Sequence, residues 1–356
     1  MNSRREQGRP RVALIPGDGI GPEVITQARR VIDALDVGVD WVELAWGTEL
    51  WLRTGEMMPE DAIEMLGDGF DAVLLGAVGD PRVSDEVTLW GLLLALRQGL
   101  DLWANERPVS LLPGVPSPLR EAGPEEIDML FIRENSEGEY SGVGGRVHRS
   151  RREEVGVETA VFTAGAIERV ARHAFECARA RRGHLISATK SNASRYGYVL
   201  WDEVVSRVGE EFPDVGTERI LVDALAARMV SNPASIDVVV ASNLFGDILT
   251  DIGAAIQGGM GMAASANVAP GADRLGIFEP VHGSAPDIAG RGMANPIGAV
   301  WSGSLLLDHI GMPRMAEMVR DAVAAAIGRG VRTRDLGGTA GTIEMGDAIV
   351  DCLEAP

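Results

Sequence analysis

Short apolar segments alternate with amphipathic segments along most of this chain, and this alternation restricts the fold more than any other feature. RVALIP (Arg11–Pro16) and DAVLL (Asp71–Leu75) have the length and composition of buried strands. Amphipathic patterns typical of helices follow them. We expect such helices at Pro22–Leu35 and Thr88–Leu102, further core strands at Ile127–Arg133, His184–Thr189, Arg219–Val222 and Ile236–Ala241, and a projecting β-arm at Arg146–Val161. Alternating strands and helices favour an α/β fold.

The turn after the first strand, Gly17-Asp18-Gly19-Ile20-Gly21, is similar to a dinucleotide-binding loop only at first sight. Its glycine spacing is G-x-G-x-G, whereas the dinucleotide fingerprint is G-x-G-x-x-G. In addition, no acidic residue ends a clear second strand about twenty residues later, where the ribose contact of that fold is expected. The sequence therefore predicts a tight turn, and we expect an α/β fold that is not a Rossmann fold.

Size and charge exclude several classes of protein. A chain of 356 residues with 46% hydrophobic residues can form two domains, or two lobes that share a sheet. The net charge of −19 and the absence of a Lys/Arg run argue against a nucleic-acid partner. No apolar stretch approaches the ~20 residues of a membrane span, and the two cysteines, Cys177 and Cys352, have no disulfide or zinc spacing. We expect a cytoplasmic protein without a membrane partner.

Two carboxylates follow the apolar strand IDVVVASN. Asp247 and Asp251 are four residues apart in NLFGDILTDIG, so a helix would place them on one face. Such a pair is most often a solvated surface, but these residues have apolar neighbours and lie at a strand end, where ligands bind in α/β sheets. Oxygen ligands suit Mg²⁺ or Mn²⁺. Asp223, after the strand in ILVDALA, is a candidate third ligand.

Three arginines and two further side chains are candidates for binding and proton transfer. Arg97, Arg107 and Arg133 each end or follow a core element; each alone suggests a structural ion pair, but together they suit a dicarboxylate. Tyr140 lies seven residues after Arg133 and can donate a proton to a carbanion. Lys190 is the only lysine of the chain, and lysine, unlike arginine, can exchange protons, although its retention could also be accidental.

The segment from Phe278 to Asn295 is rich in Gly, Ala, Ser and Pro, which is typical of a plain surface loop. It also contains side chains that suit an adenosine. His282 could stack on the base, the carboxylate of Asp287 could accept the ribose hydroxyls, and Asn295 could contact the base edge.

Taken together, these motifs resemble the β-decarboxylating dehydrogenases of isocitrate, 3-isopropylmalate and D-malate or tartrate. The resemblance runs almost from end to end and includes IPGDGIGPE, GAVG, LDLWANERP, IRENSEGEYSG, SATKSN, LVDALA, SNLFGDILTDIG and EPVHGSAPDIAGRGMANP. It implies two α/β domains that share a central mixed sheet, and a homodimer, or a higher assembly, whose active sites use residues of both chains. We expect a large domain of residues 1–102 and 257–356 and a small domain of residues 103–256 that carries the dimer interface, the projecting arm and the metal carboxylates.

The resemblance also implies roles for individual residues. Arg97, Arg107 and Arg133 would bind the substrate carboxylates, and Tyr140 would protonate the enolate. Lys190, as base, and Asp223, beside metal and substrate, would come from the neighbouring subunit. Asp223, Asp247 and Asp251 would hold Mn²⁺ or Mg²⁺. NAD would bind through Ile20 and a loop containing His282, Gly283, Ser284, Ala285, Asp287 and Asn295; a monovalent cation such as K⁺ is a further candidate cofactor.

Two positions near Arg97 bear on the substrate. Isocitrate enzymes of this family carry small polar residues six and four positions before the arginine, where this chain has Gly91 and Leu93. Isocitrate is therefore not expected. Leu93 and Leu94 are similar to the apolar pocket of 3-isopropylmalate enzymes, whereas MMPED, GAVGDPRVSDEVTLWG and LLPGVPSPL resemble the D-malate/tartrate branch. We expect oxidative decarboxylation of D-malate or oxidation of tartrate; 3-isopropylmalate dehydrogenase is the alternative, and an inactive regulatory subunit is the alternative of a different class.

Overall fold

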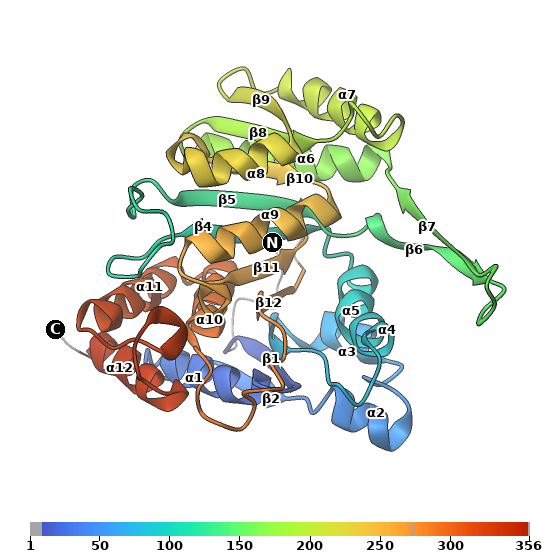
Figure 1. Ribbon diagram of the computed structural model, residues 1–356. Helices are drawn as coiled ribbons and strands as arrows, with labels where there is room; N and C mark the ends of the chain where they lie inside the picture. The colour runs from blue at the N-terminus through green and yellow to red at the C-terminus, as the bar shows by residue number, and fades with distance from the viewer. Residues whose placement is uncertain (1–8, 272–273, 355–356) are drawn as a thin grey trace.

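The computed structural model describes residues 9–271 and 274–354. The outer ends of the expected large domain, residues 1–8 and 355–356, lie outside this part. Ten strands form one mixed sheet, in the order β2-β1-β3-β12-β11-β4-β5-β10-β8-β9, and β6 and β7 form a separate hairpin (Figure 1). The strands are β1 (Arg11–Gly17), β2 (Asp40–Glu43), β3 (Ala72–Ala77), β4 (Ala104–Ser110), β5 (Asp128–Glu134), β6 (Gly138–Val147), β7 (Val155–Val161), β8 (His184–Thr189), β9 (Gly216–Leu221), β10 (Val238–Ala241), β11 (Ala264–Val268) and β12 (Gly276–Pro280).

Helices cover the sheet, so the expected α/β fold with a central mixed sheet is confirmed. They are α1 (Gly21–Asp33), α2 (Thr48–Thr54), α3 (Ala62–Gly69), α4 (Asp85–Thr88), α5 (Leu94–Gly99), α6 (Ala164–Ala180), α7 (Gly197–Gly209), α8 (Val222–Ser231), α9 (Asn243–Ile256), α10 (Ile297–His309), α11 (Pro313–Gly328) and α12 (Thr342–Glu354). Among the described residues, no helix is long and apolar enough to cross a membrane.

The apolar runs of the sequence form the centre of the sheet. Every residue of β3 and of β10 is buried, as expected for strands with helices on both faces. In α1 the buried residues recur every three or four positions, and a proline in the first turn removes an amide that would have no partner there. Burial on both faces therefore stabilises these two predicted strands.

The helix predicted at Thr88–Leu102 has different limits and is not α-helical throughout. The helical region begins at Asp85 and ends at Gly99, and the segment Leu89–Leu93 within it is π-helical. A π-helical turn contains one residue more than an α-helical turn, which hydrophobic periodicity over a short window does not reveal.

The predicted β-arm is confirmed and is longer than expected. β6 and β7 pair antiparallel and project away from the body (Figure 1). Val143, Val147, Val155 and Val157 on this arm are each about half exposed. An isolated two-stranded hairpin is only marginally stable in water, so this arm lacks the packing that would normally hold it.

Strand β4 lies at the middle of the sheet and faces two different environments. Its neighbours β5 and β11 are both antiparallel to it. Successive side chains alternate between the faces of a strand: Glu106 contacts His173 on α6, whereas Arg107 contacts Thr250 on α9. α6 and α9 therefore cover opposite faces of this half of the sheet.

Candidate active site

Three buried arginines lie on the α9 side of the sheet. Arg97, on α5, forms an ion pair with Glu279 at 2.7 Å. Arg107 donates its Nε to Asn105 and an Nη to Thr250, each at 2.6 Å. Arg133, on β5, donates two of its nitrogens to Asn243 Oδ1, at 3.0 and 2.7 Å.

The arginines are close enough to perturb one another. Burial lowers the pKa of Arg107, and burial together with the charge of Arg107 lowers the pKa of Arg133 to about 9. The Arg133 guanidinium therefore stays charged at neutral pH. Concentrated buried positive charge of this kind suits the binding of an anion with more than one carboxylate.

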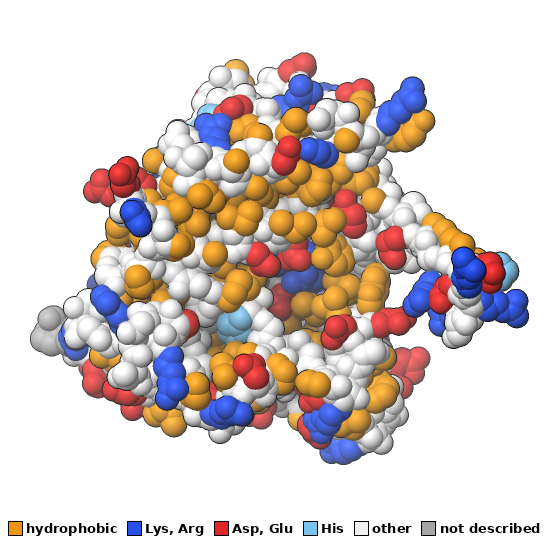
Figure 2. Space-filling view, in the orientation of Figure 1, with side chains coloured by type: hydrophobic (Ala, Val, Ile, Leu, Met, Phe, Trp, Pro, Cys, Tyr) orange, Lys and Arg blue, Asp and Glu red, His pale blue; other side chains and the backbone are white. Residues whose placement is uncertain are grey.

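Asp247 is the point where this cluster opens to solvent. It accepts from Arg133 at 2.5 Å, forms an ion pair with Arg107 at 3.2 Å, and accepts from the Tyr140 hydroxyl at 3.2 Å. Its side chain is 36% exposed, whereas that of Arg133 is 3% exposed. In Figure 2, acidic and basic side chains gather in a hollow at the centre of the visible face, below an apolar band. The cluster is thus accessible from the Asp247 side.

The pKa values of the two carboxyl groups and of the phenol shift in different directions. Burial alone would raise the pKa of Asp247, but the charges of Arg133 and Arg107 outweigh it and lower the pKa. Burial and the charge of Asp247 raise the pKa of Asp251, one helical turn later, and also raise that of Tyr140. Tyr140 is therefore a protonated donor at neutral pH, as an acid catalyst must be.

Lys190 and Asp223 form a second group. The Lys190 ammonium donates to Asp223 Oδ1 at 2.6 Å, and this hydrogen bond lowers the pKa of Asp223. Lys190 follows β8 and Asp223 lies in the first turn of α8. Among the described residues of one chain, no three His, Cys, Asp or Glu side chains gather into a set that could hold a metal ion. One chain therefore does not bring Asp223 together with Asp247 and Asp251.

The glycine turn is a tight turn, as predicted. Gly17 and Gly19 have positive φ, and a Cβ on Gly19 would lie 2.0 Å from Ser284 O. The Asp18 carboxylate accepts hydrogen bonds from the Thr48 amide and hydroxyl and from the Gly79 amide. These three hydrogen bonds fix the shape of the turn.

The loop predicted to bind adenosine packs against this turn. The Ile20 amide donates to Ser284 O at 2.8 Å. His282 Nδ1 contacts Gly283 O at 3.0 Å, and its Nε2 is buried without a hydrogen-bond partner in the described part of the chain. A Cβ on Gly283 would meet open space, and Asp287 is exposed. An unpartnered imidazole nitrogen beside an open loop fits a ligand.

Asn295 is held by the protein itself. Its Oδ1 accepts from the Ile297 amide at the start of α10, and its Nδ2 donates to Asp335 at 2.9 Å. Asp335 was not anticipated from the sequence, because it lies 40 residues further along the chain. The Nδ2 group also donates to Met262 Sδ at 3.7 Å, so both of its hydrogens are used within the protein.

The π-helical segment ends at Leu93, four residues before Arg97. Leu93 is half-buried. Trp90, which is 38% exposed, contacts Gly142 near Tyr140, since a Cβ on Gly142 would lie 2.9 Å from the indole. π-helical turns occur often at functional sites. Here the segment brings an indole from the helix against the β-arm.

The sequence did not indicate which residues hold the arginines. They are Asn105, Asn243, Thr250 and Glu279. Asn105 precedes Arg107 by two positions, so strand alternation could have shown that both face the same side. The other three lie more than 100 residues from their arginines, and no local pattern reveals them.

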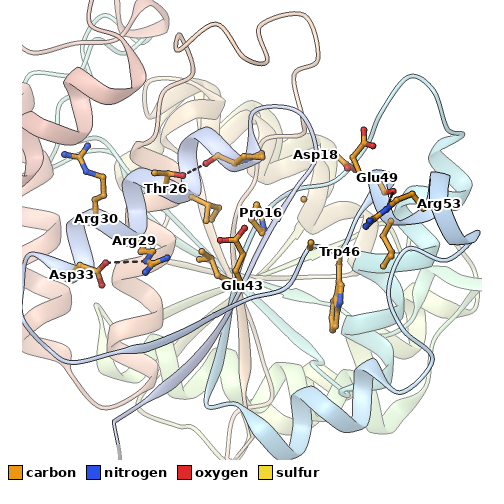
Figure 3. Close-up of a pocket in the computed structure, with 16 residues that line it drawn as sticks. Pro16, Asp18, Thr26, Arg29, Arg30, Asp33, Glu43, Trp46, Glu49 and Arg53 are labelled. Carbon is orange, nitrogen blue, oxygen red and sulfur yellow. Dashed lines mark hydrogen bonds and ion pairs between the residues drawn. The ribbon is translucent and has the colours of Figure 1, made fainter.

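A cavity of about 570 Å³ lies elsewhere, between α1, β2 and α2 (Figure 3). Pro16, Trp46 and Leu50 contribute apolar side chains to it, while Arg29, Asp33 and Glu43 are polar. None of the residues predicted for the active site lines this cavity. The arginine cluster remains the candidate site because it combines charge, burial and a proton donor.

Comparisons with known proteins agree with this geometry. Residues 11–349 match the family described as isocitrate/isopropylmalate dehydrogenase. The chain is 46% identical to a "Probable tartrate dehydrogenase/decarboxylase" of Bacillus subtilis, over 96% of this chain and 97% of the relative. It is 44% identical to a "D-malate dehydrogenase [decarboxylating]" of Escherichia coli (95% and 97%) and to a "3-isopropylmalate dehydrogenase" of Thermobifida fusca (95% and 96%).

A solved structure shows the same fold. The isocitrate dehydrogenase of Methylococcus capsulatus superposes with a TM-score of 0.89 and 33% identity, over 97% of this chain and all of the other. The fold and the family expected from the sequence motifs are both confirmed. This chain belongs to the isocitrate/isopropylmalate dehydrogenase family.

Proposed function

We propose that the chain oxidises and decarboxylates a small (R)-2-hydroxy dicarboxylate with NAD and a divalent metal, and that D-malate and tartrate are the preferred substrates. The observation that carries this proposal is the set of three buried arginines around Asp247 and Tyr140. Arg97 Nε is buried and has no hydrogen-bond partner in the described part of the chain, so it can bind a ligand carboxylate. Relatives named for tartrate and D-malate support the choice of substrate.

We propose a homodimer with shared active sites. Lys190 and Asp223 lie apart from the arginine cluster, and both are open to solvent. The half-exposed valines of the β-arm, together with Val230 on α8 and Ile248 on α9, offer apolar surface for a second chain. A partner's Lys190 and Asp223 would then complete each cluster.

The domain division follows the strand order. β2, β1, β3, β12 and β11 lie together and belong to the proposed large domain of residues 1–102 and 257–356; the other five strands belong to residues 103–256. The two domains would meet at the β11–β4 pair, beside the arginines.

The residues fit a divalent metal. Asp247 and Asp251 lie one turn apart on α9, and Asp223 of the neighbouring subunit would be the third carboxylate. Oxygen ligands suit Mg²⁺ or Mn²⁺, and such a cation would polarise the C2 oxygen of the substrate. We propose Mn²⁺ or Mg²⁺ at this position, with K⁺ as a candidate monovalent activator.

Ile20, His282 and the loop from Gly283 to Asn295 would bind NAD, which would accept the hydride from C2. The unpartnered His282 Nε2, the open space at Gly283 and the exposed Asp287 support this assignment. A carboxylate at position 287 would repel the additional phosphate of NADP, so NAD is favoured. The cytoplasmic location expected from the sequence stays a prediction.

Different side chains would bind the substrate and transfer the protons. Arg97, Arg107 and Arg133 bind the carboxylates and fix the orientation of the substrate. Lys190 of the neighbouring subunit removes the proton of the C2 hydroxyl as C2 is oxidised. After CO₂ leaves, the Tyr140 hydroxyl protonates C3, and its raised pKa keeps it protonated for this step.

Leu93 and Gly91 decide against isocitrate. Neither side chain can donate a hydrogen bond to a third carboxylate, and burying that charge unpaired should cost several kcal/mol. The half-buried Leu93 is also the observation that favours 3-isopropylmalate as a second candidate, since its isopropyl group would pack there.

The test is NAD reduction with Mn²⁺ or Mg²⁺, comparing kcat/KM for D-malate, L-malate, the tartrates, 3-isopropylmalate and isocitrate. We expect D-malate first, with pyruvate and CO₂ as products, tartrate detectable, and L-malate inactive. A clear preference for 3-isopropylmalate would show that Leu93 outweighs the likeness to D-malate and tartrate enzymes. No turnover of any diacid would favour the inactive regulatory subunit.

A further inference from the structure

Arg97 and Arg107 are joined by a continuous chain of buried hydrogen bonds. Arg107 Nε donates to Asn105 Oδ1 at 2.6 Å, and Asn105 Nδ2 donates to Asn267 Oδ1 at 2.8 Å. Asn267 Nδ2 donates to Glu279 Oε1 at 2.8 Å, and the same oxygen accepts from Arg97 at 2.7 Å. Each link is shorter than an average N–H···O bond, as expected where charged groups end the chain.

Asn267 is the centre of this chain. Its Oδ1 also accepts from Asn135 at 3.0 Å, and its Nδ2 also donates to Ile277 O at 3.1 Å. An amide has two acceptor positions and two donor hydrogens, so Asn267 uses all four. It has no exposed surface. A side chain held on four sides has one orientation, and so do the groups bonded to it.

Asn267 lies in the sheet at the boundary between the two proposed domains. Asn267 on β11 lies directly opposite Asn105 on β4, at the strand pair where the two proposed domains meet. This series of hydrogen bonds therefore connects Arg97, on one side of the boundary, with Arg107 on the other. The two guanidiniums repel each other, since the charge of Arg97 lowers the pKa of Arg107. Without the amides between them, they would tend to separate.

We propose that Asn267 is a positioning residue that sets the spacing of Arg97 and Arg107 before the substrate binds. Together with Asn105 and Glu279 it holds the two guanidiniums at the separation that a short diacid bridges. This inference rests on the proposed function, because it assumes that these arginines bind the substrate. Its consequence is that Asn267, which does not touch the substrate, controls substrate affinity.

The test is the variant Asn267→Asp, which preserves size and the acceptor atom but places an oxygen 2.8 Å from Glu279 Oε1 in place of the donor. The lost donor and the new repulsion should displace Glu279 and with it Arg97. We expect KM for D-malate to rise by about 10- to 100-fold, the range for losing a hydrogen bond to a charged group. KM for NAD and kcat should change by no more than about threefold, since the reacting groups stay in place.

Two further variants make the result specific. Asn267→Ser is smaller and introduces no charge, so it should raise KM in the same direction even if Asn267→Asp does not fold. Gln27→Glu also changes a buried amide into a carboxylate, on α1, where the amide oxygen accepts from Arg30 at 2.7 Å. Gln27→Glu should leave KM for D-malate unchanged.

The outcomes separate this inference from the proposed function. If wild type prefers another diacid of the panel, the substrate assignment changes and KM is measured with that diacid. If both Asn267 variants keep the wild-type KM and lose only melting temperature or active fraction, Asn267 is structural and the inference is wrong. If wild type turns over no diacid at all, both proposals are wrong.

Discussion

Gly246 lies on α9 beside Asp247, and its lack of a side chain makes room for Arg133. A Cβ at this position would lie 2.6 Å from Arg133 Cγ and 2.7 Å from its Cβ. Ordinary carbon contacts are about 3.5–4.0 Å, so Gly246→Ala must displace Arg133 or the helix by about 1 Å. The hydrogen bonds of Arg133 to Asn243 and Asp247 oppose that movement.

The two effects on stability have opposite signs. Alanine is favoured over glycine within a helix by about 1 kcal/mol, whereas overpacking a closely packed site costs about 1–3 kcal/mol. The free energy of unfolding should therefore fall by about 0–2 kcal/mol. The effect on turnover should be larger, because a shift of about 1 Å in a group that positions the substrate can lower kcat/KM by about 100-fold.

Steady-state kinetics with D-malate, combined with thermal unfolding, measures both quantities. Gly165→Ala is the matched control: Gly165 also lies in a helix, but a Cβ there would meet no atom within 4 Å. It should keep wild-type kinetics and gain slightly in stability. If Gly246→Ala retained the wild-type kcat/KM, then Arg133 would not position the substrate, and our reading of the cluster would be refuted.

Four other predictions concern the metal, the base, the assembly and His173. Asp247→Asn and EDTA-treated wild type should both be nearly inactive, and full turnover in EDTA would exclude the metal. Lys190→Arg should fold and lose about 10²- to 10⁴-fold in rate; a near-normal rate would require another base. Mixed Lys190→Met and Tyr140→Phe chains should regain activity after subunit exchange, and no recovery would contradict shared sites. For His173, burial opposes protonation, but hydrogen bonds to Cys177 and Glu106 raise the pKa from 6.5 to about 10. The stabilisation by the protonated imidazole is therefore fully present below pH 6.5 and is lost as pH rises through about 10. The loss in unfolding free energy caused by His173→Gln should shrink between pH 6 and 10.5, and a loss that stays constant over this range would rule out the ion pair.

The sequence predicted the buried apolar strands, and it also predicted Arg219–Val222, which overlaps the mostly exposed edge strand β9; that strand ends at Leu221, and Val222 begins α8. His184–Thr189 is a strand with the predicted limits, and β10 lies within Ile236–Ala241. β4, ANERPVS, was not predicted, because its polar residues resemble a loop. They are polar because the strand carries Asn105 and Arg107 on one face and Glu106 on the other.

The candidate site was predictable in its charged residues but not in their surroundings. Arg107, Arg133, Tyr140 and Asp247 are brought together by the structure. Their uncharged hydrogen-bond partners Asn243 and Thr250 lie on α9, more than 100 residues away in sequence. Asn267, in turn, comes near Asn105 only through the pairing of β11 with β4. Lys190 and Asp223 form a pair of their own, which the sequence motifs SATKSN and LVDALA did not reveal as a contact.

The order of strands also bears on how the chain folds as it is synthesised. β3 ends at Ala77 and β4 begins at Ala104, yet they are not neighbours, because β11 and β12, which come much later in the sequence, lie between them. Until β11 and β12 leave the ribosome, the growing protein has two separate half-sheets, and the unpaired edge that β3 forms is wholly apolar. Such edges are prone to pair with other chains, and pairing of distant segments is slow. The nascent chain should therefore be most dependent on chaperones just before its last quarter emerges.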